Sequence, residues 1–289
     1  MEAKIINGRD IASEIRLGLK NDVEKLKRNG VQPGLAVVIV GDDPASRIYV
    51  NNKKKVCDEI GIRSFEYALP AETSEEEVIE LIKTLNGDKN VHGILVQLPL
   101  PQHINSERVL FEIDPDKDVD AFHPVNVGKI MIGNYKFLPC TPAGVMELIH
   151  RTGIDLKGSE CVVVGRSNIV GKPMAMLLLH EHATVTVCHS RTKDLKSVCR
   201  RADVLVVAVG KPELIKADFI KPGAVVIDVG INRMENGKLC GDVDFDGAKS
   251  VASYITPVPG GVGPMTIAML MKNTVKAAEM RVSAGLSTF

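Results

Sequence analysis

The sequence predicts an α/β protein of two alternating lobes, the second a Rossmann-like doubly wound dinucleotide-binding domain. Short apolar runs alternate with helix-period segments along the whole chain of 289 residues, which is long enough for two domains. The runs are continuously apolar, as in parallel strands covered by helices on both faces. The alternation pauses once, in a Pro- and Asp-rich passage at 114–129, and then restarts.

In the first half, the expected elements follow in chain order. The helix-period segment 8–30 leads into an apolar strand at 35–41. Next we expect a helix at 46–61, a strand at 64–70, a helix from Ser74 to about Leu85, a strand at 93–98 and a short helix from Asn105 to about Ile113. The turn formers in 114–129 indicate a loop, and PCTPAG at 139–144 opens a helix to about Arg151.

The second half repeats the pattern. Its expected elements are a strand at 160–165, a helix from Gly171 to about His180, a strand at 184–190, a helix at 194–202, strands at 204–210 and 224–230, and a helix from Met265 to about Arg281. We therefore expect one domain over 1–140 plus 266–289 and a dinucleotide-binding domain over 141–265. The active site is expected in the cleft between them, where ligand sites are common.

Composition excludes several classes of function. Lys+Arg and Asp+Glu both number 36, so the net charge is zero and a general nucleic-acid binder is not expected. The start, MEAKIINGRD, lacks the apolar run of a secretory signal, and no segment approaches the roughly 20 apolar residues of a membrane span. These features predict a cytoplasmic protein that binds neither nucleic acid nor membrane.

The cysteine and histidine patterns do not indicate a metal site. The 6 cysteines include no C-x-x-C pair, and in a reducing cytosol we expect free thiols. His180-Glu181-His182 lacks the H-E-x-x-H spacing that places two imidazoles on one helix face. We interpret this triplet as a polar helix end and predict no metal.

A glycine loop, VVVGRSNIVGKP at 162–173, lies between an expected strand and an expected helix, which is the context of phosphate binding. Its glycines are Gly165 and Gly171, and Ser167 replaces the central glycine of G-x-G-x-x-G. The competing interpretation is the nucleophile elbow G-x-S-x-G of hydrolases, which would require glycine where Ile169 stands. The neighbouring strands favour dinucleotide binding.

The residues after the next strand select between cofactors. An NAD site places Asp or Glu there to bind the ribose 2′-hydroxyl, whereas this chain has Cys188-His189-Ser190-Arg191. Ser190 can donate to a 2′-phosphate and Arg191 can neutralise it. Arg166 in the glycine loop offers a second cation. The pattern therefore predicts NADP as the cofactor.

The run YVNNKKK contains a tyrosine and three lysines, Lys53, Lys54 and Lys55, on one expected helix. Tyr49 and Lys53 are four residues apart and share a helix face, while the other two lysines point elsewhere. A Y-x-x-x-K pair also occurs in short-chain dehydrogenases, but there it follows the glycine loop, and here it precedes the loop. At most one of the three lysines, Lys53, can therefore lie directly beside the tyrosine, and we interpret Lys54 and Lys55 as solvated residues.

Ten segments, in this order, identify a family: SRIYVNNKKK, GILVQLPLPQHIN, PDKDVDAFHPVNVGK, PCTPAGVMELI, VVVGRSNIVGKPMAMLLL, ATVTVCHSRT, VLVVAVGKP, VVIDVGIN, GDVDF and ITPVPGGVGPMT. Over essentially its whole length the sequence resembles the bifunctional methylenetetrahydrofolate dehydrogenase/cyclohydrolase family. The resemblance implies NADP-dependent oxidation of 5,10-methylenetetrahydrofolate to 5,10-methenyltetrahydrofolate, and hydrolysis of the latter to 10-formyltetrahydrofolate. It also implies a homodimer of one-carbon metabolism, with a connection to purine biosynthesis.

The resemblance implies a set of site residues. The catalytic positions are Lys53, Tyr49, Gln97 and Asp120, with Asp120 at the position that binds the pterin. The substrate-binding positions are these four together with Ser46, Val96, Leu98, Pro259, Gly260, Gly261, Val262 and Gly263. The dinucleotide positions are Gly165, Arg166, Ser167, Ser190 and Ile231, to which the charge argument adds Arg191.

Two positions depart from the family's usual pattern. His92 stands where the family usually has aspartate, and because it begins a strand distant in sequence from the chemistry we expect little effect. Ala121 stands where glycine usually follows DVD, and it would strain the loop and could move Asp120 if that position needs a positive φ. Two alternatives are a monofunctional dehydrogenase, against which Lys53 argues, and a non-catalytic folate- or nucleotide-binding protein, which would not need Lys53, Tyr49 and Gln97 together.

Overall fold

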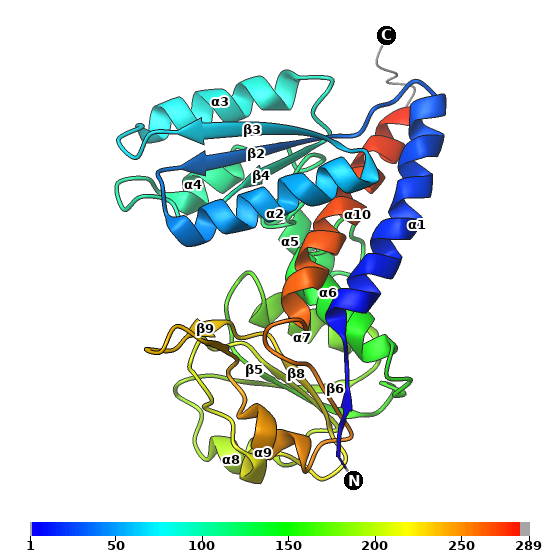
Figure 1. The fold of residues 1–289 in the computed structure, drawn as a ribbon, viewed down its shortest axis with the longest axis vertical. Coiled ribbons are helices and arrows are strands. Elements are labelled where there is room, and N and C mark those ends of the chain that lie inside the picture. Colours follow the sequence, from blue (N-terminus) through cyan, green and yellow to red (C-terminus); the bar gives the residue numbers. More distant parts are fainter. Residues whose placement is uncertain (1, 284–289) are drawn as a thin grey trace. The chain divides into compact units, whose positions relative to one another are not determined.

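The chain folds into two compact units, and the computed structural model describes residues 2–283 (Figure 1). Unit 1 comprises Met1–Ser13, Ile130–Asn134 and Thr141–Thr266, and unit 2 comprises Glu14–Lys129, Tyr135–Cys140 and Ile267–Phe289. Each unit has its own parallel sheet, which confirms the predicted α/β class. Four helices contain residues of both units: α1 (Gly8–Arg28), α5 (Pro124–Met131), α6 (Cys140–His150) and α10 (Val262–Ser283).

Unit 2 is organised around a three-stranded parallel sheet of order β3-β2-β4. The strands are β2 (Gly34–Val40), β3 (Arg63–Leu69) and β4 (Gly93–Val96), and the helices between and after them are α2 (Pro44–Ile60), α3 (Glu75–Gly87) and α4 (Ser106–Phe111). Figure 1 shows α2 and α3 on opposite sides of this sheet. Every residue of β2 and β4 is buried, as their uninterrupted apolar sequences predict.

Local sequence signals fix the ends of helices α2 and α3. The carboxylate of Asp43 caps α2 by accepting from the Ser46 N–H at 2.8 Å, and Pro44 occupies the first turn, where a missing N–H costs nothing. Gly61 ends α2 in the left-handed region at φ 86°. Ser74 and Glu77 form a capping box at α3. These signals are local, and the helix bounds expected from the sequence differ from those observed by only a few residues.

Unit 1 contains a six-stranded sheet of order β1-β11-β8-β7-β5-β6, with all strands parallel. Its strands are β1 (Lys4–Ile5), β5 (Glu160–Val164), β6 (Thr184–Cys188), β7 (Val204–Val207), β8 (Val225–Asp228) and β11 (Tyr254–Ile255). Its connections include α7 (Gly171–His180), α8 (Leu195–Cys199), the 3-10 turn η1 (Ala217–Phe219) and α9 (Phe245–Lys249). The next strand in sequence after β5, which is β6, lies on one side of β5, and the following strand, β7, lies on the other. The strand order therefore reverses between β5 and β7, and ligands of doubly wound folds bind at such reversals.

The structure corrects one expectation and adds elements that the sequence did not indicate. The passage 114–129, expected to be loop, contains the first part of helix α5, because Pro124 can occupy a first helical position. A short antiparallel hairpin joins β9 (Asn232–Arg233) to β10 (Leu239–Cys240). Strands β1 and β11 are two residues each, too short to leave a periodic signal.

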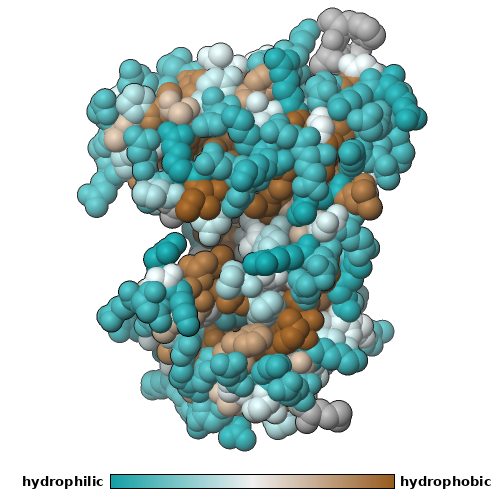
Figure 2. All heavy atoms as spheres, in the orientation of Figure 1, coloured by the Kyte–Doolittle hydropathy of each residue, from teal (hydrophilic) through white to brown (hydrophobic). Residues whose placement is uncertain are grey.

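The drawn surface of each unit is mainly hydrophilic. Figure 2 shows hydrophilic side chains over most of the drawn face of each unit, with smaller apolar areas among them. Among the described helices, none is long and apolar enough to cross a membrane.

Candidate active site

Lys53 is held in unit 2 by a direct contact with Gln97. The lysine lies on α2 with 9 % of its surface exposed, and its Nζ donates to Gln97 Oε1 at 2.8 Å. Gln97 follows directly after β4, and its own Nε2 donates to the Leu98 carbonyl at 2.7 Å. Because the amide nitrogen is engaged, the amide oxygen is directed at the lysine. The two residues expected to work together are thus neighbours, although 44 residues separate them in the sequence.

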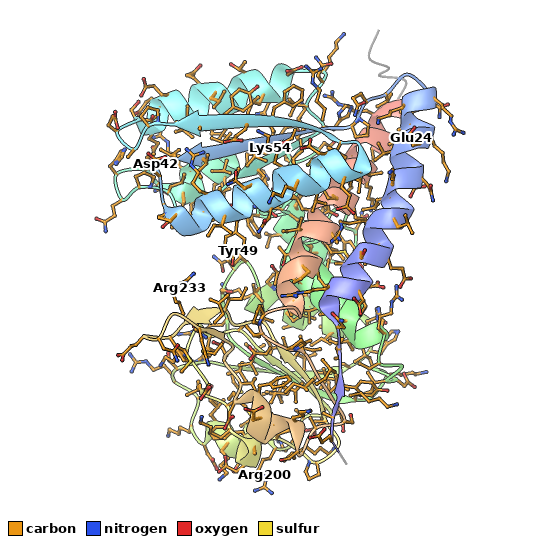
Figure 3. All side chains as sticks on the ribbon, viewed as in Figure 1. Glu24, Asp42, Tyr49, Lys54, Arg200 and Arg233 are labelled. Atoms are coloured by element: carbon orange, nitrogen blue, oxygen red, sulfur yellow. The ribbon has the colours of Figure 1, made fainter. Side chains whose placement is uncertain are left out.

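The three lysines of YVNNKKK have different surroundings. Lys53 is buried, whereas Lys54 and Lys55 are exposed, and Lys54 Nζ lies 3.4 Å from the Glu66 carboxylate on β3. Tyr49 is 40 % exposed and leaves α2 on a different side from Lys54 (Figure 3). Its ring, one helical turn before Lys53, is therefore available to a ligand.

Burial and charge set the protonation of the site. Burial lowers the pKa of Lys53, and the negative charge of Asp120 opposes that shift. Burial likewise raises the pKa of Asp120, opposed by the positive charge of Lys53 and by the nearby Cys140 thiol. A lysine with a lowered pKa is neutral more often near pH 7 and can then accept a proton.

The carboxylate of Asp118 organises the loop around Asp120 by accepting hydrogen bonds. Asp118 Oδ2 accepts from the His123 N–H and from Asn126 Nδ2, both at 2.8 Å. Asp118 O accepts from the Ala121 N–H at 3.1 Å. Ala121 is fully buried with φ 57°, so the position does need the left-handed region that glycine adopts more easily.

Two residues that the sequence did not single out secure the same loop. Asn273 of α10 donates through Nδ2 to the carbonyls of Val119 at 2.8 Å and Leu138 at 2.9 Å. The Cys140 thiol lies 3.4 Å from the Val119 carbonyl and donates to it. Asn273 lies in none of the ten family segments, and Cys140 lies in PCTPAGVMELI but had no role assigned to it. Their only other sequence signal is a polar or thiol side chain within an apolar helix pattern.

The other predicted residues of unit 2 lie on or next to α2 and β4, the elements that carry Lys53 and precede Gln97. Ser46 is 4 % exposed in the first turn of α2, and Val96 is 4 % exposed at the end of β4. Leu98, one residue beyond Gln97, is half-buried.

His92 is a buried residue that joins two strands of unit 2. It is 1 % exposed, and its Nδ1 accepts from the Gly34 N–H at 3.1 Å, which links the starts of β4 and β2. Burial, with Arg281 and Lys117 nearby, lowers its pKa to about 4, so the ring is neutral at physiological pH. This position joins two strands at their amino ends.

The predicted dinucleotide residues lie in unit 1: Gly165, Arg166 and Ser167 follow β5, Ser190 and Arg191 follow β6, and Ile231 follows β8. Gly165 follows β5 with φ 138°, and a Cβ there would lie 2.3 Å from the Ala208 carbonyl oxygen after β7. Ser167 Oγ accepts from the N–H groups of Val170 at 3.1 Å and Gly171 at 3.3 Å, which shapes the turn into α7. Only a glycine allows the loop to pack this closely onto the neighbouring strand end.

The cationic residues around this turn fit an anionic ligand. Arg166, Ser190 and Arg191 are exposed, and within residues 2–283 neither arginine forms an ion pair. The His189 ring accepts from the Arg191 N–H at 3.1 Å, which orders the turn after β6. This donor set suits the phosphates of NADP.

The P-G-G-V-G loop, Pro259 to Gly263, also belongs to unit 1. The Arg9 N–H of α1 donates to the Gly260 carbonyl at 3.1 Å. A Cβ on Gly8 would lie 1.9 Å from the Gly261 carbonyl oxygen, so the helix can begin against the loop only because residue 8 is glycine. Within the described chain, no group of three His, Cys, Asp or Glu side chains could hold a metal ion.

Comparison with known proteins decides the family. Residues 6–120 match the catalytic domain of tetrahydrofolate dehydrogenase/cyclohydrolase, and residues 139–282 match the NAD(P)-binding domain of the same family. The chain belongs to the tetrahydrofolate dehydrogenase/cyclohydrolase family. A bifunctional FolD protein of Acetivibrio thermocellus is 71 % identical over 281 residues, which cover 97 % of this chain and 99 % of that protein.

Solved structures of the tetrahydrofolate dehydrogenase/cyclohydrolase family have the same fold. The bifunctional FolD enzyme of Campylobacter jejuni is 52 % identical with a TM-score of 0.95, covering 96 % of this chain and 99 % of its own. The FolD enzyme of Trypanosoma brucei, solved with NADP and an inhibitor, is 43 % identical with a TM-score of 0.94, covering 98 % of this chain and 99 % of its own.

These findings confirm the predicted fold class and the predicted bifunctional enzyme, methylenetetrahydrofolate dehydrogenase and methenyltetrahydrofolate cyclohydrolase. They favour two activities over the monofunctional alternative. The NAD(P)-binding match and the relative solved with NADP support the predicted cofactor, NADP.

Proposed function

We propose that Lys53, Gln97, Asp120 and Tyr49 form the centre at which this enzyme oxidises 5,10-methylenetetrahydrofolate with NADP and hydrolyses the 5,10-methenyl product to 10-formyltetrahydrofolate. The observation that carries the assignment is the buried Lys53 ammonium, hydrogen-bonded to Gln97 Oε1 at 2.8 Å. A buried lysine with a neutral hydrogen-bond partner and a lowered pKa is equipped to move protons near neutral pH.

The hydrolysis step uses that proton chemistry. A water molecule adds to the carbon between N5 and N10 of the methenyl cation, and neutral Lys53 accepts the proton that the water loses. The C–N5 bond then breaks: the added hydroxyl releases its proton to water and becomes the formyl oxygen, N5 takes a proton from the Lys53 ammonium, and the formyl group stays on N10. The positive charge of the bound methenyl group lowers the lysine pKa further, so the base is neutral when it is needed.

Asp120 and Tyr49 position the substrate. A carboxylate can accept from both the ring N–H and the exocyclic amine of the pterin, and the paired groups around Asp118 hold Asp120 in place for this contact. The exposed ring of Tyr49 offers a face on which the aminobenzoate can stack. The segment Pro259 to Gly263 is assigned to the same substrate.

Gly165, Arg166, Ser167, Ser190, Arg191 and Ile231 are the residues that would hold NADP, with Arg166 and Arg191 at its phosphates. The bound nicotinamide supplies the hydride acceptor for the oxidation. The same proposal places the domains at 1–140 plus 266–289 and at 141–265. It also takes the enzyme as a cytoplasmic homodimer that supplies 10-formyl groups to purine biosynthesis.

The role of Lys53 is tested by measuring both activities separately in Lys53→Ala. We expect hydrolysis of methenyltetrahydrofolate to fall by roughly 10²–10⁴-fold, the usual contribution of a general acid–base group, while oxidation stays within about tenfold of wild type. Lys54→Ala is the matched control, because it removes an exposed lysine from the next position of the same helix. Equal loss of both activities, or equal effects of the two substitutions, would contradict the assignment.

A further inference from the structure

The buried carboxylate of Asp242, which is not one of the predicted site residues, organises the part of unit 1 where we propose that NADP binds. Asp242 is fully buried. Its Oδ2 accepts from the N–H groups of Val209 at 2.7 Å and Gly210 at 3.0 Å. Its Oδ1 accepts from the Lys211 N–H at 2.8 Å and from Asn232 Nδ2 at 2.9 Å. One carboxylate therefore ties together two segments that are distant in the sequence.

Both segments lie where the family's cofactor residues lie. Val209 to Lys211 follow β7, directly after Ala208, whose carbonyl oxygen would be 2.3 Å from a Cβ on Gly165. The strand order reverses between β5 and β7, which is where dinucleotides bind in doubly wound folds. Asn232 follows Ile231, and the Ile231 Cδ1 would be 3.6 Å from a Cβ on Gly263 of the P-G-G-V-G loop.

Backbone hydrogen bonds and two glycines make room for the Asp242 carboxylate. Asp228, at the end of β8, accepts from the N–H groups of Asp242 and Val243, both at 2.9 Å. A Cβ on Gly230 would lie 2.3 Å from Asp242 Cγ, and a Cβ on Gly241 would lie 1.8 Å from Asp228 Oδ2. The glycines of DVGIN and CGDVDF are thus required by the two carboxylates, which pack where side chains would otherwise be.

We propose that Asp242 is a positioning residue of the dehydrogenase: its carboxylate fixes Val209–Lys211 and the Ile231–Asn232 turn in the geometry that receives the nicotinamide end of NADP. This inference rests on the proposed function, which places NADP at the carboxyl ends of β5 and β6 and at Ile231. The hydrolytic residues Lys53, Gln97 and Asp120 all belong to unit 2, so the two activities respond differently to a change at Asp242.

The test is Asp242→Asn, which preserves shape but not acceptor capacity. Each carboxylate oxygen of Asp242 accepts from two N–H donors. In Asp242→Asn an NH₂ group replaces one of these oxygens. In either orientation of the amide, the NH₂ group faces two N–H donors and can accept from neither. Because bonds to a charged acceptor are among the stronger ones, we expect kcat/KM for NADP to fall roughly 10–100-fold, mainly through a higher KM. Cyclohydrolase activity is expected to stay within about twofold of wild type, because Lys53, Gln97 and Asp120, which carry the hydrolysis, belong to unit 2.

Asp203→Asn is the matched control. Asp203 also accepts from a backbone N–H, that of Glu160 at 2.9 Å, and from Lys221 Nζ at 2.7 Å. It precedes β7 and therefore lies at the opposite, amino-terminal edge of the same sheet. Asp203→Asn is expected to lower thermal stability and leave the KM for NADP unchanged.

Asn232→Ala provides a milder variant in case Asp242→Asn does not fold. It removes only the side-chain link between Asp242 and the Ile231–Asn232 turn, and we expect roughly a threefold to tenfold rise in the KM for NADP with the cyclohydrolase rate retained. The inference is overturned if Asp242→Asn folds and keeps the wild-type KM for NADP and the wild-type kcat. If Asp242→Asn does not fold, the same result for Asn232→Ala overturns it. It is also overturned if oxidation and hydrolysis fall together. Failure of the proposed function would appear in the wild type itself, as an absence of NADP reduction with methylenetetrahydrofolate.

Discussion

Asn273 connects α10 to the loop that carries Asp120, and its removal gives the sharpest test of how that loop is held. In Asn273→Ala, the carbonyls of Val119 and Leu138 lose the donor that now lies 2.8 and 2.9 Å away. The Val119 carbonyl keeps the Cys140 thiol at 3.4 Å, a weak donor. Each lost neutral hydrogen bond contributes about 1 kcal/mol, and a buried carbonyl left unpaired costs about 1–3 kcal/mol.

We therefore expect Asn273→Ala to lower the free energy of unfolding by about 2–4 kcal/mol. At about 2–4 °C per kcal/mol for a chain of this size class, the Tm falls by about 5–15 °C. Since Asp120 directly follows Val119, the KM for the folate substrate should rise in the same variant. Urea titration, thermal melting and steady-state kinetics measure the three effects.

Asn273→Asp sharpens the test, because it replaces the donor nitrogen with an oxygen that faces the same two carbonyls. The buried carboxyl is destabilised when ionised, so its pKa in the folded state is above the unfolded value of about 3.9. This carboxyl group therefore destabilises the fold least at low pH, and its unfavourable contribution to the free energy of unfolding grows as the pH rises through the folded pKa. Lys272→Ala, an exposed neighbour on α10, is the control and should change stability by less than about 0.5 kcal/mol. An Asn273→Asp variant as stable as wild type at pH 8 would refute the donor argument.

Two further predictions concern the DKDVDA segment. Lys117 is 2 % exposed and donates to the carbonyls of Leu85 and Asp88, both at 2.8 Å, and burial lowers its pKa to about 8. The unfolded lysine has a pKa of about 10.4, so between pH 8 and this value the unfolded state binds more protons than the folded state. Lys117 therefore makes the free energy of unfolding rise with pH in this range. Urea midpoints measured from pH 7.5 to 10.5 should show this rise in wild type, and Lys117→Met should lack it. Ala121 has φ 57°, and Ala121→Gly should change stability by less than about 1 kcal/mol, because the strain relieved is offset by chain entropy and a lost buried methyl. Ala121→Val should cost more than about 2 kcal/mol by the same denaturation assay, and a neutral valine would show that the position tolerates a branched side chain in the left-handed region.

Much of the fold follows from sequence signals that act over a few residues. The capping box at Ser74 and the stop at Gly61 are local hydrogen-bond and backbone preferences, so the helices they bound could be predicted. The buried strands β2 and β7 are uninterrupted apolar runs, which only a sheet covered on both faces requires. Helix α5 was not predicted, because the Pro and Asp residues around it also favour turns and only its packing selects the helix.

The residue types of the site were also readable in the sequence. The spacing of Tyr49 and Lys53 places them on one face of a helix, and the absence of an acid after β6 favours NADP over NAD. Both inferences depend on neighbours along one element, so no tertiary contact was needed to make them. The resemblance to a family added Gln97 and Asp120, which no local pattern pairs with Lys53.

The tertiary structure alone decided what supports those residues. Asn273 meets the Val119 carbonyl across 154 positions of the chain, and Asp242 meets the Val209 N–H across 33. A polar residue at such a position gives no periodic signal, because its partner is a backbone group whose place depends on the whole fold. The sequence by itself determined which side chains could perform the chemistry, and the fold determined which buried acceptors and donors hold them in place.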